Sequence, residues 1–92
     1  MPEKTFPKEI ECQIAKLLIR FREKKGISQE YLGTQLGMNQ SSIAKIEGGR
    51  RKLTLTEFLI ICNVLDVDFQ EIANELEKIY QITKSKSFWT DV

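Results

Sequence analysis

Apolar residues recur at intervals of three and four along most of the sequence, which is the spacing of amphipathic helices. This spacing covers five segments, at residues 7–24, 29–36, 40–47, 55–65 and 69–82. Short stretches with glycine or polar residues separate the segments, and none alternates in the manner of a half-buried strand. The sequence therefore predicts an all-α domain of five helices.

Residues that start and stop helices stand at the ends of these segments. Pro7 suits the first turn of a helix, where its missing N–H is not needed, and Gly26 can end one in a left-handed conformation. Ser28 can cap the next helix. Thr54 and Glu57 have the spacing of a capping box, in which each side chain satisfies an exposed amide of the other residue.

The stretch from 28 to 47 predicts two short helices joined by a tight turn. Gly37 stands where a left-handed cap is needed, and Asn39 can cap the second helix through its side-chain oxygen. Gly33 has no side chain, so it allows the second helix to cross the first closely. The arrangement is a helix-turn-helix.

The second of these helices, 40–47, has one apolar and one polar face. Ile43 and Ile46 form the apolar face, and the polar residues are Gln40, Ser41, Ser42 and Lys45. A short polar helix end can enter the DNA major groove and bond to base edges. An ordinary helical hairpin explains the apolar spacing equally well, but not these side chains beside the basic run 50–52. We therefore expect DNA recognition.

Several runs of residues match a known pattern: REKKG at 22–26, ISQ at 27–29, LG at 32–33 and 36–37, and IEGGR at 46–50. With them, residues 18–72 resemble the Cro/repressor-type helix-turn-helix family, also called XRE-like transcriptional regulators, found in prokaryotes and phages. Gly33 replaces the usual alanine and should cost about 1 kcal/mol of helix propensity. Leu53 replaces a frequent proline, and we expect neither departure to prevent the fold.

The resemblance implies roles for individual residues. Gln29 matches a position that contacts a DNA phosphate and supports the recognition helix, whereas Gln40, Ser41 and Lys45 match positions that face bases. By their chemistry, Gln40 can pair with adenine and Lys45 can donate to guanine acceptors. Ser41 can bond to almost any base edge, so it discriminates weakly.

Five further residues are expected beside the DNA backbone. Asn39 and Ser42 suit the phosphates that flank the groove, although Asn39 can equally do no more than cap its helix. Arg50, Arg51 and Lys52 follow the recognition helix and should meet phosphates, which adds affinity and salt dependence but little sequence choice. For any one of these three, solvated surface charge is the alternative.

Arg22 and Glu47 are expected to form a structural ion pair. Both stand in otherwise apolar or packed stretches, and the family pattern pairs an arginine at the end of the first helix with this glutamate. A partly buried pair would tie the first helix to the third. Removal of either partner would leave the charge of the other poorly solvated.

Charge is unevenly distributed, although the net charge is only +1. Residues 20–52 hold eight basic and three acidic residues, a net +5, and residues 53–82 hold one basic and six acidic residues, a net −5. This difference predicts one side that attracts a polyanion and another that repels it.

Other classes of function find little support in the sequence. Cys12 and Cys62 stand in predicted helices without a CxxC motif, and the chain has no histidine, so we expect no metal, no cofactor and no enzyme activity. No apolar run is long enough to span a membrane, and the first residues have no signal-peptide pattern. We expect a cytoplasmic protein.

The segment 55–65 is apolar on almost every side, which a domain of this size cannot bury alone. We therefore expect residues 1–82 to form the DNA-binding domain, with an extended last helix for homodimerisation, and 83–92 to form a C-terminal tail. Alternatively, the last helix and the tail fold back over 55–65 in a monomer. Phe88 and Trp89 in the tail can pack across a dimer or within their own subunit.

These observations favour a small dimeric regulator that binds double-stranded DNA at a pseudo-palindromic operator. A phage repressor, a restriction–modification controller and an antitoxin are all of this kind. The alternative is an antitoxin or interaction module whose helices bind a partner protein, with DNA contact secondary. Binding to random duplex that falls with salt would favour the first hypothesis.

Overall fold

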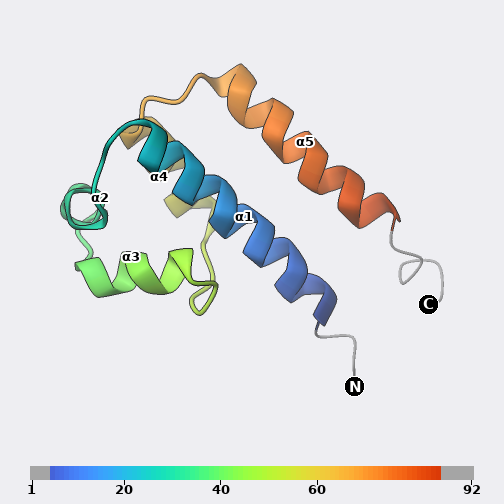
Figure 1. Ribbon diagram of the computed structural model, residues 1–92, viewed down its shortest axis with the longest axis horizontal. Helices are drawn as coiled ribbons and strands as arrows, with labels where there is room; N and C mark the ends of the chain where they lie inside the picture. The colour runs from blue at the N-terminus through green and yellow to red at the C-terminus, as the bar shows by residue number, and fades with distance from the viewer. Residues whose placement is uncertain (1–4, 86–92) are drawn as a thin grey trace.

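Residues 5–85, which the computed structural model describes, fold into five α-helices and contain no strand. The helices are α1 (Thr5–Lys24), α2 (Gln29–Leu36), α3 (Gln40–Glu47), α4 (Leu55–Val64) and α5 (Phe69–Ser85) (Figure 1). The prediction of an all-α, five-helix domain is confirmed. The last helix ends later than expected, so residues 83–85 of the expected tail are helical. Phe88 and Trp89 lie outside the described residues.

The helix ends use the residues that the sequence offers for them. Ser28 and Asn39 each accept a hydrogen bond from the backbone N–H three residues on, at 3.0 and 2.9 Å. Thr54 and Glu57 make both bonds of the capping box, each 3.1 Å long. Gly37 ends α2 with φ of 71°, a left-handed conformation that glycine adopts without strain. The turn that positions α3 is therefore encoded locally.

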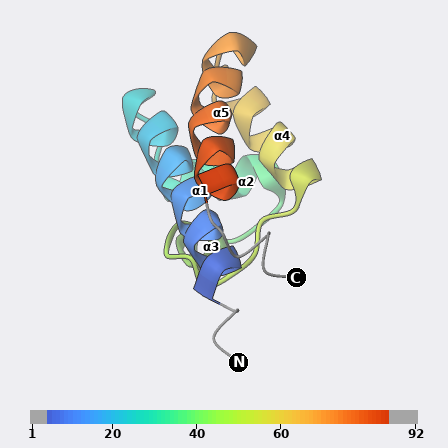
Figure 2. The same cartoon turned by 90° about the vertical axis from the view of Figure 1, so that its right-hand side faces the viewer.

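The helix α1 lies in the middle of the fold, with α3 on one side and α5 on the other (Figure 1). Seen from the end where α1 begins, α5 lies between α1 and α4 (Figure 2). The buried cluster takes side chains from every helix: Leu17, Leu18, Phe21, Leu32, Ile43, Ile46, Phe58, Ile61, Cys62, Leu65, Ile72 and Ile79. Burial of these apolar groups is the main force that holds the helices together.

The helices α2 and α3 cross so closely at Gly33 that a side chain there has no room. A Cβ atom at Gly33 would lie only 2.7 Å from the carbonyl oxygen of Met38, which is a backbone atom and cannot rotate away. The Met38 N–H also donates to the Gly33 carbonyl at 2.8 Å, which holds the two backbones together. The crossing thus requires glycine at position 33, although glycine lowers the helix propensity of α2.

We expect Gly33→Ala to destabilise the protein, although alanine is the better helix former. Overpacking at the crossing should lower the free energy of unfolding by about 1–3 kcal/mol. The higher helix propensity of alanine should raise it by only about 1 kcal/mol. Urea denaturation would measure the difference, with Gln35→Ala as the control at an exposed position of the same helix. A gain in stability for Gly33→Ala would show that the crossing can relax.

Candidate nucleic-acid interface

One face of α3 is open to solvent and the other is sealed in the core. Gln40, Ser41 and Lys45 are exposed, whereas Ile43 and Ile46 are only 1% and 3% exposed. The apolar pair anchors the helix, so its polar side chains project outward from a rigid support. A short helix presented in this way has the shape to enter a major groove.

At the start of α3, the Asn39 side chain works as a cap. Its Oδ1 accepts from the Ser42 backbone N–H at 2.9 Å and from the Ser41 hydroxyl at 2.8 Å. The amide nitrogen of Asn39 donates no hydrogen bond to another of the described residues, and Asn39 is exposed. The capping role suggested by the sequence is therefore present, and the side-chain N–H₂ group stays available to an outside acceptor. Ser42, half-buried, contributes its backbone N–H to the cap.

Arg22 and Glu47 form an ion pair with two hydrogen bonds between α1 and the end of α3. Arg22 Nε donates to Glu47 Oε2 at 2.6 Å, and Nη2 donates to Oε1 at 3.0 Å. A third bond, 2.7 Å long, joins Arg22 Nη1 to the Ile27 carbonyl. The side chains are 12% and 6% exposed, and the bonds to Glu47 raise the pKa of Arg22 above its ordinary value although burial lowers it. The pair fastens α3 to the body of the domain.

A chain of hydrogen bonds continues from this pair to the exposed end of α3. Gln29 Nε2 donates to Glu47 Oε1 at 2.9 Å, and Gln40 Nε2 donates to Gln29 Oε1 at 3.4 Å. A carboxylate can only accept, so Gln29 must turn its nitrogen to Glu47 and its oxygen to Gln40. The Glu47 carboxylate thereby sets the direction of two amides in succession. The resemblance implied a supporting role for Gln29, but these directions have no signal in the sequence.

Three cations on α3 or in the loop after it have no acidic partner among residues 5–85. They are Lys45, Arg50 and Lys52. All three are exposed. Because no carboxylate neutralises them, they are the basic groups of this surface that can meet phosphate oxygens.

Arg51 stands in the same basic run but has a different environment. Its Nη1 and Nη2 donate to the two carboxylate oxygens of Glu57, at 3.1 and 2.9 Å. The bonds from Arg51, followed by the Thr54 backbone N–H, lower the pKa of Glu57 to about 2. Glu57 is therefore ionised at neutral pH, and Arg51 links the loop to the start of α4.

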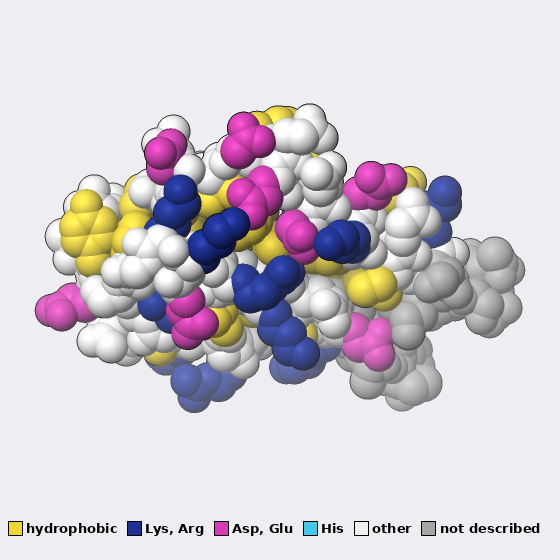
Figure 3. Space-filling view, turned by 45° about the horizontal axis from the view of Figure 1, so that its top comes forward, with side chains coloured by type: hydrophobic (Ala, Val, Ile, Leu, Met, Phe, Trp, Pro, Cys, Tyr) yellow, Lys and Arg dark blue, Asp and Glu magenta, His cyan; other side chains and the backbone are white. Residues whose placement is uncertain are grey.

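The two oppositely charged parts of the sequence meet on the face formed by α1 and α5. Arg20 Nη2 lies 3.1 Å from Glu75 Oε1, and Lys24 Nζ lies 3.2 Å from Glu71 Oε2. Figure 3 shows basic and acidic side chains mixed over this side of the molecule. The expected division into a basic and an acidic side is therefore wrong for this face. Near α3 and the loop after it, the described residues leave Lys45, Arg50 and Lys52 without an acidic partner.

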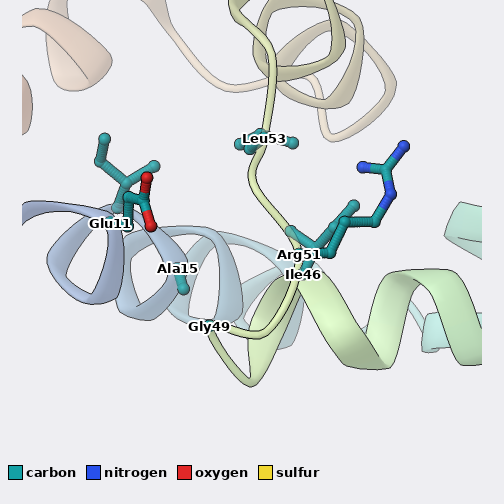
Figure 4. A pocket seen from close by; sticks show the side chains of 7 residues that line it. Glu11, Ala15, Ile46, Gly49, Arg51 and Leu53 are labelled. Carbon is teal, nitrogen blue, oxygen red and sulfur yellow. The ribbon is translucent and has the colours of Figure 1, made fainter. Parts of the chain in front are cut away.

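The loop after α3 also borders a small pocket, shown in Figure 4. The pocket lies between α1, the end of α3 and the loop, with Ala15, Ile46 and Leu53 in its lining, and its volume is about 30 Å³. That volume suits about one water molecule, and the Arg51 guanidinium points away from it (Figure 4). Within residues 5–85 no three metal-binding side chains are grouped, and no helix could cross a bilayer.

Comparison with known families places the chain in a family. A model of the helix-turn-helix family matches residues 18–72, which contain the whole of α2, α3 and α4 and most of the buried cluster. A comparison with curated proteins gives no match. The matched region is more than half of the 92 residues and includes every residue of the α3 surface described above. The chain belongs to the Cro/repressor-type, XRE-like helix-turn-helix family of DNA-binding transcriptional regulators.

Proposed function

We propose that the protein is a sequence-specific regulator that binds double-stranded DNA as a homodimer on a pseudo-palindromic operator. The observation that carries this proposal is the exposed polar face of α3, together with three exposed cations, Lys45, Arg50 and Lys52, that have no acidic partner among residues 5–85. In this arrangement α3 lies in the major groove, where Gln40, Ser41 and Lys45 face the bases.

The direction of the Gln40 amide favours adenine as its target. One N–H of Gln40 Nε2 is used by Gln29, which leaves one N–H and the oxygen Oε1 for a base. Adenine offers N7 as an acceptor and N6–H₂ as a donor, so both groups are matched, whereas guanine offers only acceptors there. We expect this pairing to discriminate by about 1–3 kcal/mol.

The remaining polar residues act on the backbone in this proposal. Arg50 and Lys52 meet phosphates by charge, and the free amide nitrogen of Asn39 does so at the start of α3. Gln29 and Ser42 lie half-buried at the same end of the helix and support these contacts. Arg51 keeps its bonds to Glu57 and braces the loop. Contacts of this kind position the protein without choosing a sequence.

A homodimer is supported by large apolar side chains that are exposed in the described part of the subunit. Leu59 and Ile60 on α4 are 51% and 44% exposed, and Phe69 at the start of α5 is 71% exposed. We call these three residues the dimer face. Beside Leu59 and Phe69 lies an open pocket of about 180 Å³ that a side chain of the second subunit can fill. Burial of each large side chain contributes about 1.5–3 kcal/mol.

Selection of bound sequences from a random duplex pool tests the proposal. We expect an inverted repeat whose half-sites are centred about 10 base pairs apart. Gln40→Ala should relax the preference at one position of each half-site, and Arg50→Ala should weaken all sequences and reduce the salt dependence by about one phosphate contact. Lys78→Ala on α5 removes an exposed cation on the side of α1 away from α3 and is the control.

The alternative, a module that binds a partner protein through the same helices, makes a different prediction. Binding to duplex DNA would then be absent or insensitive to salt between two concentrations. Fluorescence anisotropy with a random duplex measures this directly, and that outcome would reject DNA recognition by α3.

A further inference from the structure

The guanidinium of Arg51 is already occupied by a carboxylate. Besides the two bonds that it donates to Glu57, Arg51 Nη1 donates to the Lys52 carbonyl at 3.2 Å. The planar N–H fork of an arginine can bind either a carboxylate or a phosphate through two parallel bonds. Glu57 therefore occupies the same donors that a DNA phosphate would need.

The backbone keeps Arg51 beside the α3 surface. The N–H groups of Arg50 and Arg51 donate to the Lys45 carbonyl at 2.8 and 3.2 Å, so the loop starts directly against the end of α3. Arg50 and Lys52, the two neighbours of Arg51, are the cations assigned to phosphates in the proposed function. The Arg51 side chain is 36% exposed, and its guanidinium points away from the small pocket (Figure 4). Burial therefore does not keep this cation from DNA.

Glu57 is held in place by the start of α4 as well as by Arg51. Its Oε1 accepts from the Thr54 backbone N–H at 3.1 Å, and its own backbone N–H donates to Thr54 Oγ1 at 3.1 Å. The Glu57 side chain is 19% exposed. The bonds from Arg51, followed by that from the Thr54 N–H, hold its pKa at about 2. The carboxylate is thus fixed and ionised at neutral pH.

We propose that Glu57 acts as an internal substitute for phosphate, which holds Arg51 off the DNA and lowers the affinity for any duplex. The inference rests on the proposed DNA binding by α3 and adds a residue that limits this binding. To reach a phosphate, Arg51 would have to give up both bonds to Glu57 and leave this carboxylate unpaired near the negatively charged DNA backbone. Because phosphate contacts carry no sequence information, the limit applies to operator and other DNA alike.

Glu57→Gln tests the inference, because it releases Arg51 and leaves the capping box intact. Glutamine also serves at this position of the box, but its amide nitrogen cannot accept the bond from Arg51 Nη2. We expect tighter binding to a random duplex, measured by fluorescence anisotropy with the full chain. One added phosphate contact should increase the loss of affinity between about 50 and 200 mM salt by about 3–4-fold.

Two further variants separate the release of Arg51 from a general change of charge. Glu30→Gln removes the same charge from α2, where the carboxylate is exposed and has no basic partner among residues 5–85. It should not reproduce the increase in salt dependence. Arg51→Gln/Glu57→Gln removes both charges, so it keeps the net charge of the wild type and should also keep its salt dependence. Far-UV circular dichroism and thermal melting verify that the variants are folded.

Three results would overturn the inference. Equal salt dependence for Glu57→Gln and Glu30→Gln means that Glu57 does not withhold Arg51. A double variant whose affinity falls about 3–4-fold less with salt than that of the wild type means that Arg51 meets a phosphate even beside Glu57. Both of these results leave DNA binding by α3 intact. Wild-type binding that is absent or insensitive to salt rejects DNA recognition by α3, and this inference with it.

Discussion

Arg22→Met should lower the free energy of unfolding by up to about 3–5 kcal/mol, the cost of leaving a fully buried charge without its partner. Glu47 is only 6% exposed on its side chain and would lose both bonds to the guanidinium, with Gln29 as its remaining donor. The Ile27 carbonyl would lose its bond as well. In a domain of this size each kcal/mol corresponds to about 4–8 °C in melting temperature. Thermal and urea denaturation measure the loss.

Two further variants separate the buried pair from ordinary surface charge. Arg20→Met removes the arginine two positions earlier, whose pair with Glu75 is exposed, and should cost less than about 1 kcal/mol. The double variant Arg22→Met/Glu47→Leu removes both charges and should recover most of the loss. Equal stabilities for Arg22→Met and Arg20→Met would show that the pair between α1 and α3 contributes no more than a surface contact.

Leu59→Glu should separate the dimer and weaken binding to a full operator by about 10²–10⁴-fold, the gain expected from joining two recognition helices. A carboxylate on the dimer face would have to be buried without a partner, which is costly. Binding to a single half-site should be unchanged, because Leu59 lies on α4 and takes no part in the α3 surface. Sedimentation gives the oligomeric state, and anisotropy with full and half sites gives the affinities.

Thr56→Glu is the matched control for this prediction, since it adds the same charge at an exposed polar position of α4. It should leave both the dimer and operator binding intact. If Leu59→Glu remains a dimer, the subunits meet through another surface. If the wild-type protein occupies its operator as a monomer, the two-fold arrangement is wrong.

Most of the fold could be predicted because its signals act over short distances along the chain. The Thr54 and Glu57 capping box, the left-handed Gly37 and the Ser28 cap each involve residues within four positions of one another. The face of α3 also followed from spacing alone, since Ile43 and Ile46 had to be buried together. Placing Gln40 and Lys45 on its exposed side needed no tertiary information.

The partners of individual charged and amide groups could not be predicted in the same way. Arg50, Arg51 and Lys52 are equivalent in the sequence, yet only Arg51 reaches Glu57, because the loop turns it back toward the start of α4. The basic and acidic residues occupy separate parts of the sequence. In the folded chain α5 packs against α1, and this packing places Arg20 beside Glu75. Such pairs depend on how elements cross in space.

The helices α2 and α3 show most clearly which features follow from the sequence alone and which depend on the tertiary structure. Helix periodicity and caps are properties of neighbouring residues, so the primary structure alone specifies both helices, the turn between them and the polar side that faces outward. Which way the Gln29 and Gln40 amides point depends on Glu47, which the packing of α1 against α3 places beside Arg22. A hydrogen bond needs its partners within about 3 Å, and only the folded chain brings residues that are 11 to 25 positions apart that close together.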